Sequence, residues 1–134
     1  MSVWALLVAL ALCAPNAQGA SLRSFDPDYR PGQDTRVTLS ISPSTSTLAY
    51  ALEETPPPGW SIKNANQSGA IVGGKIKWGL YFDNTARVFT YDAAPPAITS
   101  DQTFSGVVSL DGVSTQIGGQ AVIKFDRTPP DTPK

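Results

Sequence analysis

Side chains that could act as nucleophiles, acid–base catalysts or metal ligands are few in this sequence of 134 residues. It contains no histidine, and Cys13 is its one cysteine. Zinc sites and nucleophiles activated by histidine or cysteine need side chains that the sequence does not supply. No glycine-rich loop has the spacing of a phosphate cradle followed by Lys and Ser or Thr. We therefore expect no catalytic residue, no bound metal and no cofactor.

Carboxylates offer two weaker possibilities. Glu53 and Glu54 are adjacent, and a pair of carboxylates can cleave a glycosidic bond. In a strand, however, neighbouring side chains point to opposite faces, so we expect this pair to be separated and both charges to be solvated at the strand end. Asp26 and Asp28 lie beside Tyr29 and could give oxygen ligands to calcium, but the remainder of a calcium-binding loop is missing.

Aromatic residues are the remaining candidates for binding a ligand. Trp60, Trp78, Tyr81 and Phe82 could stack on the apolar faces of sugar rings. Aromatic side chains also supply much of the buried area of small β domains. The pattern favours the core for both tryptophans, whereas Tyr81 and Phe82 fall in a loop-like stretch and are open to either role. Exposed, coplanar rings would favour sugar binding, and buried rings would favour a scaffold.

Three polar positions in expected loops or at the start of an expected strand have simpler interpretations. Asp83 and Arg87 are expected to satisfy backbone groups of a turn or to pair at the surface. The triplet that begins at Asn66 matches the acceptor pattern for N-glycosylation, which matters only in a host that glycosylates such sites.

The elements that must position these residues are short strands. Residues 35–41 alternate cleanly, with Val37, Leu39 and Ile41 on one face, and residues 47–54 are expected to place Leu48 on the same face as Tyr50 and Leu52. Gly73-Gly74 and Asp111-Gly112 are signals for two-residue hairpin turns. Further strands are expected at residues 60–63, 70–72, 75–78, 87–91, 103–110, 113–117 and 120–125, and residues 21–25 could add a short edge strand.

This arrangement predicts the fold class. Turn signals recur roughly every 8–12 residues, and no helical period is present after residue 20. The sequence predicts an all-β, immunoglobulin-like antiparallel β-sandwich of about eight or nine strands, with a barrel as the alternative. The Cys, Trp and Cys pattern of true immunoglobulin domains is absent, so the likeness is one of architecture.

The two ends of the chain differ from the β-rich part. Residues 1–20 carry no charged side chain, and an apolar run over residues 3–14 is followed by small residues. This is typical of a signal peptide, although no Lys or Arg lies near Met1; the run is shorter than the roughly 20 residues that span a bilayer. A lipid anchor at Cys13 would need a small residue in place of Leu12. The domain is then expected over residues 21–125, and residues 126–134 form a Pro- and Thr-rich tail or linker.

Charge and cysteine content limit the partners. The formal net charge is -1, which gives no electrostatic reason to expect nucleic acid or an acidic membrane as a partner. If the first 20 residues are removed, the chain has no cysteine and so no disulfide or thiol chemistry, and no membrane span.

A resemblance adds to these expectations. The runs Tyr50-Ala-Leu-Glu-Glu-Thr-Pro-Pro-Pro-Gly-Trp60, Gly74-Lys-Ile-Lys-Trp-Gly79, Phe82-Asp83 and Arg87-Val-Phe-Thr-Tyr91 resemble a bacterial Ig-like repeat or accessory module of large secreted or surface proteins. The resemblance covers roughly residues 26–125 and implies a non-catalytic structural or adhesive role, but it carries over no site residue. We expect a single module in this chain, which differs from the usual setting of such repeats and argues against a spacer role.

The sequence as a whole therefore predicts a secreted or cell-surface module. We expect its partner to be an extracellular protein or a polysaccharide. Binding of a protein is the first hypothesis, and a carbohydrate-binding module that uses loop aromatics is the alternative.

Overall fold

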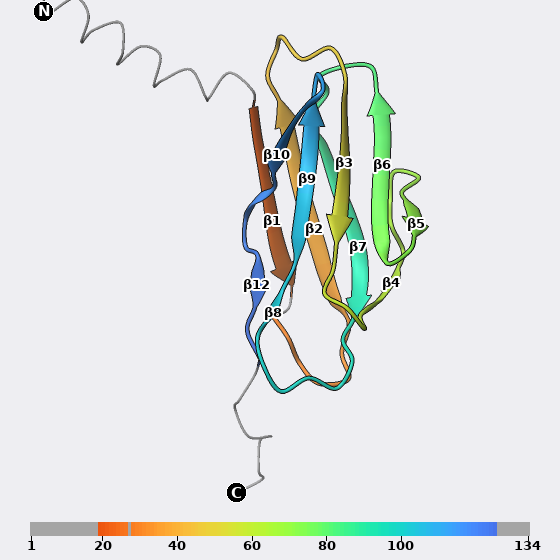
Figure 1. Cartoon of the computed structure of the whole chain (residues 1–134), viewed down its shortest axis with the longest axis vertical. Coiled ribbons are helices and arrows are strands. Elements are labelled where there is room, and N and C mark those ends of the chain that lie inside the picture. Colours follow the sequence, from red (N-terminus) through yellow and green to blue (C-terminus); the bar gives the residue numbers. More distant parts are fainter. Residues whose placement is uncertain (1–18, 27, 126–134) are drawn as a thin grey trace, which may run out of the picture.

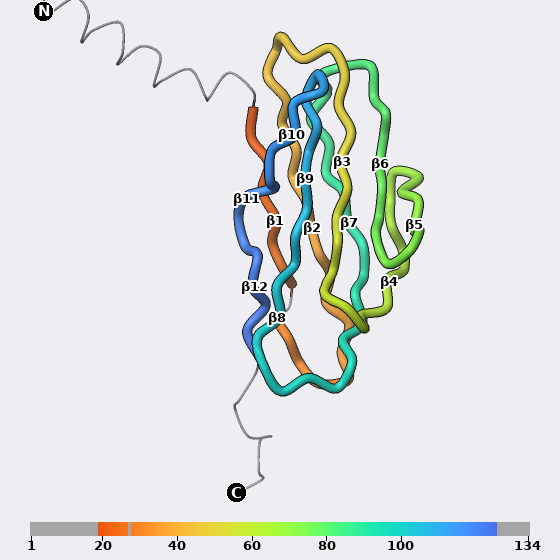
Figure 2. The backbone as a smooth tube through the Cα atoms, viewed as in Figure 1, coloured from red at the N-terminus to blue at the C-terminus, as the bar shows by residue number. Residues whose placement is uncertain are grey.

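The computed structural model describes residues 19–26 and 28–125, which form two five-stranded sheets packed face to face (Figure 1). The first sheet has the order β11-β1-β2-β7-β4, and the second has the order β10-β9-β3-β6-β5. A two-stranded sheet, β12-β8, lies at one end (Figure 2). The strands are β1 (Gly19–Asp26), β2 (Thr35–Pro43), β3 (Tyr50–Thr55), β4 (Ser61–Lys63), β5 (Ala70–Val72), β6 (Lys75–Tyr81), β7 (Arg87–Ala94), β8 (Gln102–Thr103), β9 (Ser105–Leu110), β10 (Val113–Gln116), β11 (Gly118–Gly119) and β12 (Val122–Ile123).

The fold confirms the predicted immunoglobulin-like β-sandwich. All strand pairs are antiparallel except β1 with β11, which run parallel. Twelve strands are present within the described residues, against the expected eight or nine, because the stretch after residue 102 is divided into short pieces. β1 is also longer than expected, and the two-residue β11 lies outside it in the sheet.

Alternation along the strands builds the core. Val37, Leu39 and Ile41 of β2 are buried as predicted, and they lie against the inward side chains of the neighbouring strand β7. The second sheet contributes its own inward row, so one cluster of apolar side chains fills the space between the sheets. Burial of each large apolar side chain contributes about 1.5–3 kcal/mol of transfer free energy, so this cluster supplies the main favourable term for folding.

Both predicted hairpins are confirmed. Gly73 and Gly74 join β5 to β6 with φ angles of 59° and 76°. Asp111 and Gly112 join β9 to β10 with φ angles of 51° and 83°. Two successive residues in the left-handed region match the twist of the flanking strands, which is why these residue types mark the turns.

One predicted strand is wrong at its beginning. β3 starts at Tyr50 and not at residue 47, and Leu48 is exposed instead of sharing the buried face with Tyr50 and Leu52. The backbone N–H groups of Leu48 and Ala49 both donate to Oδ1 of Asp111, at 2.9 Å each, and not to a neighbouring strand. The apolar alternation therefore extends beyond the strand itself.

Two predictions concern residues that the structure does not describe. The signal segment lies outside the described residues except for Gly19 and Ala20, which begin β1, and the tail after Phe125 lies outside them entirely. Within the described part of the chain, no helical segment has the length and hydrophobicity needed to cross a bilayer.

Candidate functional site

The two adjacent glutamates have opposite environments. Glu53 points outward and pairs with Lys75 at 3.2 Å and with Lys77 at 3.6 Å. Glu54 points inward and is fully buried between the sheets. Their predicted separation is confirmed, but the expectation that both are solvated is wrong for Glu54. Side chains alternate between the two faces of a strand, and Glu54 falls on the same face as Tyr50 and Leu52. That face of β3 points into the core.

Glu54 is held by a buried ionic cluster that joins the two sheets. Arg23 of β1 donates two hydrogen bonds to its carboxylate, from Nε to Oε2 and from Nη2 to Oε1, both at 2.7 Å. Tyr91 of β7 donates a third from its hydroxyl at 2.9 Å. Burial raises the pKa of Glu54, and the hydrogen bonds and charge of Arg23 oppose that rise. Every oxygen of this carboxylate is engaged, so the cluster fixes the sandwich and offers no free acid or base.

Both tryptophans that were candidates for a sugar platform lie in the core. The exposed fraction of Trp78 is 2%, and its indole Nε1 donates to the backbone oxygen of Asn66 at 2.8 Å. Trp60 is buried and packs edge-on against Phe104, with ring centroids 5.1 Å apart. Neither indole presents a face to solvent. The structure therefore does not bring Trp60, Trp78, Tyr81 and Phe82 together as an exposed surface.

The side chain of Asn66 forms hydrogen bonds with the part of the β7 edge that β4 does not cover. Its Oδ1 accepts from the backbone N–H of Thr90 at 2.8 Å, and its Nδ2 donates to the backbone oxygen of Val88 at 3.1 Å. Asn66 thus continues the pairing with β7 beyond the end of β4. The nitrogen that would carry an N-linked glycan is already used in this contact, so the triplet at Asn66 has a structural role.

Three loops at one end of the sandwich, residues 44–49, 82–86 and 111–112, are called here the tip loops; this end is at the top of Figure 1. Asn84 donates from Nδ2 to the backbone oxygen of Thr45 at 2.8 Å, which ties the first two loops together. The contacts of Asp111 with Leu48 and Ala49 tie the third loop to the first. Backbone and side-chain hydrogen bonds thus connect all three loops.

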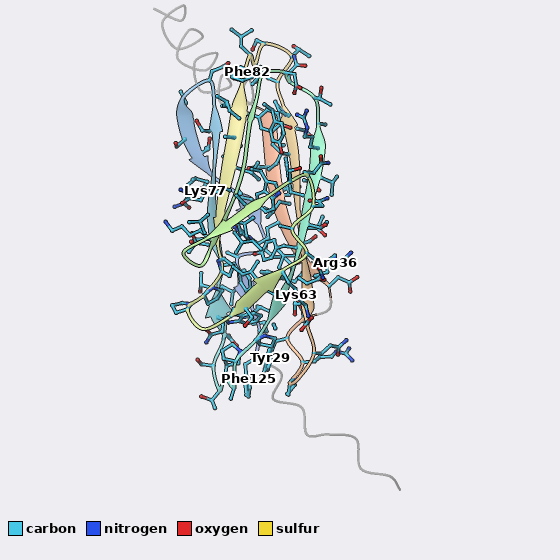
Figure 3. All side chains as sticks on the ribbon, turned by 90° about the vertical axis from the view of Figure 1, so that its right-hand side faces the viewer. Tyr29, Arg36, Lys63, Lys77, Phe82 and Phe125 are labelled. Carbon is cyan, nitrogen blue, oxygen red and sulfur yellow. The ribbon has the colours of Figure 1, made fainter. Side chains whose placement is uncertain are left out.

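Arg87 orders the loop that follows β6. Its guanidinium pairs with Asp83 at 2.8 Å, confirming the predicted surface pairing. It also donates to the hydroxyl of Tyr50 at 2.9 Å and lies 4.0 Å from the ring centroid of Tyr81. The hydrogen bonds from Arg87 lower the pKa of Asp83. Tyr81 is consequently half-buried beneath a cation, while the next residue, Phe82, projects from the tip (Figure 3).

Large apolar side chains are exposed at the same end. Phe82 is 79% exposed and Leu48 is 78% exposed, and Leu80 of β6 is 56% exposed. The register pairs Tyr50 with Tyr81, so the residues just before β3 and just after β6 leave the sheet next to each other. We call Leu48, Leu80 and Phe82 the apolar tip. Leu48 was missed by the sequence reasoning because its alternation with Tyr50 mimics a buried strand position.

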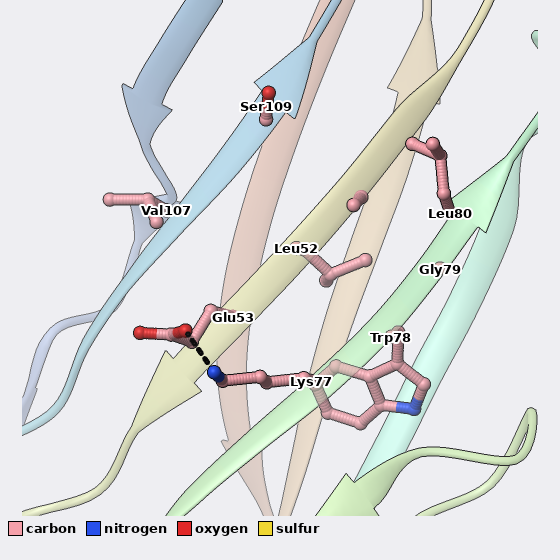
Figure 4. Close-up of a pocket in the computed structure, with 9 residues that line it drawn as sticks. Leu52, Glu53, Lys77, Trp78, Gly79, Leu80, Val107 and Ser109 are labelled. Carbon is pink, nitrogen blue, oxygen red and sulfur yellow. Dashed lines mark ion pairs between the residues drawn. The ribbon is translucent and has the colours of Figure 1, made fainter. Parts of the chain in front are cut away.

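A shallow groove adjoins the apolar tip. It has a volume of about 290 Å³ and lies on the outer face of β9, β3 and β6, where Leu80 lines its upper end (Figure 4). Small residues create the hollow: a Cβ placed on Gly79 would lie 2.9 Å from the Cβ of Ala51. Glu53 and Lys77 form an ion pair at the other end. We call this hollow the sheet groove.

The calcium possibility gains no support from geometry. Among the residues that the structure describes, no group of three or more Asp, Glu, His or Cys side chains is placed to hold a metal ion.

Comparisons with known proteins show similarity without a family assignment. No family model matches the chain. An uncharacterised protein of Archaeoglobus fulgidus is 25% identical over 136 residues, covering 99% of this chain and 82% of that protein. Its identity is too low, and its description too general, to transfer a function.

Solved structures with a similar strand arrangement are distant. A chitin-binding domain of a Pyrococcus furiosus chitinase gives a TM-score of 0.49 at 7% identity, with 72% of this chain and 92% of that domain covered. The domain ChBD2 of Thermococcus kodakarensis gives 0.46 at 14% identity, with 69% and 90% covered. An uncharacterised Nocardia farcinica protein with an immunoglobulin-like fold gives 0.43 at 14% identity, with 86% and 89% covered. The site must therefore be interpreted from the chain's own residues.

Proposed function

We propose that this protein is an exported, non-catalytic β-sandwich module that binds another protein outside the cell or at its surface. The apolar tip and the adjoining sheet groove are the contact surface in this proposal. The observation that carries it is the exposure of Leu48, Leu80 and Phe82 at one end of the sandwich. Large apolar side chains clustered on a surface mark interaction sites, whereas single exposed ones need no explanation.

The hydrogen bonds of the tip loops support this role. Asn84 and Asp111 link the loops, and Arg87 fixes the position of the residue that precedes Phe82. Binding costs less conformational entropy when the contacting side chains stand on loops that are already ordered. The loops are thus suited to present apolar side chains to a partner.

Side-chain chemistry favours a protein over a polysaccharide or a polyanion. Leu48 and Leu80 are branched aliphatic groups and have no flat face to stack on a sugar, and both candidate indoles are buried. Arg87 is the one cationic residue in or directly beside the tip loops, and Asp83 neutralises it. An apolar pocket on a partner protein is the surface that such side chains fit.

The carbohydrate-binding alternative rests on Phe82. Its ring is 79% exposed and follows Tyr81, whose ring is already covered by Arg87. One exposed ring is a smaller platform than the sequence suggested, but it is available for stacking.

A photo-crosslinker placed at residue 82 tests the proposal. The labelled chain is added to intact cells and culture medium of the producing organism, and a second version carries the same group at residue 88. Val88 is also exposed but lies on β7, in the other sheet. We expect one saturable protein adduct from position 82 and none from position 88. Adducts with glycan alone, or equal labelling from both positions, would contradict binding of a protein at the tip.

A further inference from the structure

One edge of the second sheet is a short strand made only of apolar residues. β5 pairs with β6 on one side, and no other strand of the described residues pairs with it. It lies on the outer side of β6 in Figure 1 and faces the viewer in Figure 3. Its side chains are exposed, among them Ile71 at 45% and Val72 at 60%. Edge strands are normally protected by charge, proline or a bulge, and β5 carries none of these.

The backbone of Ile71 is oriented for pairing with a further strand. Val72 and Lys75 flank the two-residue turn between β5 and β6, and residues in that position exchange hydrogen bonds. Hydrogen-bonded and non-hydrogen-bonded pairs alternate along an antiparallel ladder, so the next pair, Ile71 with Ile76, is of the second kind. The N–H and C=O of Ile71 therefore point away from β6. They can exchange two hydrogen bonds with one residue of an added antiparallel strand.

Positive charge selects the side chains that such a strand would carry. Residues 60–82 contain three lysines and no Asp or Glu, although the whole chain has a formal net charge of -1. Two of these lysines, Lys75 and Lys77, stand beside β5 and share the one carboxylate of Glu53. The register places Lys77 opposite Ala70. An added strand would lie about 4.8 Å beyond β5, so the long Lys77 side chain can reach it across the methyl group of Ala70.

Charge also argues against a second copy of this chain as the added strand. Antiparallel pairing of two β5 strands about a two-fold axis at Ile71 would set Ala70 of one copy opposite Val72 of the other. Each such row would then have a lysine on both sides, Lys77 of one copy and Lys75 of the other. Like charges in one row repel, whereas an acidic segment adds attraction at the same positions.

We propose that β5 binds an extended acidic segment of another protein, which adds to the second sheet as a sixth strand. An apolar residue of the segment lies opposite Ile71, and the carboxylates on either side of it face Lys77 and Lys75. The contact needs no residue of the apolar tip, although Lys77 also lines the sheet groove. This proposal and the one for the apolar tip can therefore fail independently.

Titration of the full chain with designed peptides tests this proposal, with the amide signals of residues 70–74 followed by nuclear magnetic resonance. The probe is acetyl-TVEVEVT-amide, and the comparison peptide acetyl-TVKVKVT-amide has lysine in place of glutamate. We expect saturable shifts from the acidic peptide and binding about tenfold weaker or less from the basic one. Methylation of the backbone nitrogen at the central valine should abolish binding, because it removes a ladder donor. Absence of saturable shifts with the acidic peptide, or equal binding of all three peptides, would overturn the proposal.

Proline variants separate strand addition from contact with side chains alone. I71P removes an N–H that β6 does not use, so the sheet should remain intact while binding of the acidic peptide falls about tenfold or more. S114P is the matched control, because Ser114 holds the corresponding outward position on β10, at the other edge of the same sheet. It should bind the peptide like the wild type. Contacts between Trp78 and Phe89, whose centroids lie 5.2 Å apart, verify folding in each variant.

The charge contact and the alternative occupant have tests of their own. K77Q leaves the backbone of β5 unchanged and should reduce the preference for the acidic over the basic peptide. Equal binding by I71P and S114P would overturn strand addition, and an unchanged preference in K77Q would overturn the acidic partner. Shifts in residues 70–74 that appear when the protein alone is concentrated, and that I71P abolishes, would identify a second copy as the occupant and would also overturn the proposal.

Discussion

Residues that were expected to be polar surface turn out to hold the sandwich together. The sequence predicted that Glu54 is one of two solvated charges at a strand end. In the structure it joins β1, β3 and β7 through Arg23 and Tyr91. The sequence predicted a possible glycosylation site at Asn66. In the structure its side-chain amide forms hydrogen bonds with the backbone of Val88 and Thr90. Neither role has a local sequence signal, because the partner residues are far apart in the chain and only the fold brings them together.

Removing one side of the buried ion pair should be costly. R23M leaves the carboxylate of Glu54 buried without its cation, and we expect a loss of about 3–5 kcal/mol in unfolding free energy, measured with urea. The double variant R23M/E54L removes both charges and should recover most of that loss. A loss below about 1 kcal/mol for R23M would contradict the buried, paired state of Glu54.

Asp92 should make stability depend on pH. Arg36 and Asn64 donate to its carboxylate, and these contacts lower its pKa. Because the folded-state pKa lies below the unfolded value of about 3.9, the stabilisation is fully present above that value and is lost as pH falls through the folded pKa. The D92N variant should therefore lose less stability than the wild type on acidification from pH 6 to pH 2, with both followed by thermal unfolding. Parallel curves would contradict this assignment.

For strands and turns, the sequence predicts the features that depend on residues close together in the chain. The alternation of β2 and the glycine-containing turns at 73–74 and 111–112 were read correctly, because hydrophobic period and left-handed backbone preference are local properties. The start of β3 was misplaced since the amides of Leu48 and Ala49 are satisfied by the distant Asp111. The prediction merged β8 and β9 into one strand over residues 103–110 and missed β11, because the limits of these short strands depend on tertiary pairing.

The turn between β9 and β10 gives a test at this scale. Asp111 combines a positive φ of 51° with a carboxylate that accepts two backbone N–H groups. Asp111→Ala should destabilise the protein by about 1–3 kcal/mol, because it leaves two donors without their acceptor and places alanine in a strained conformation. Asp111→Asn keeps an acceptor oxygen and tolerates the conformation, so it should cost less. Chemical denaturation of both variants provides the comparison, and an equal cost would contradict the argument.

For the whole molecule, the sequence predicted the architecture but not which of its apolar side chains are exposed. Burial of Trp60 and Trp78 removes the broad aromatic platform that the sequence allowed. The exposed large apolar side chains Leu48 and Phe82 instead lie at one end of the sandwich, on loops that hydrogen bonds hold together. A linear sequence shows which residues are apolar, whereas exposure is decided by the packing of segments that are distant in the chain.

The most direct test of protein binding at the apolar tip uses the partner identified by crosslinking at residue 82. Its dissociation constant is measured by calorimetry for the wild type, for L48S/F82S and for the control L22S/V88S, which changes apolar residues of similar chemistry exposed on the first sheet. We predict that L48S/F82S binds at least tenfold more weakly, which corresponds to about 1.4 kcal/mol, and that the control binds like the wild type. Unchanged binding by L48S/F82S, or equal weakening by the control, would contradict the proposal.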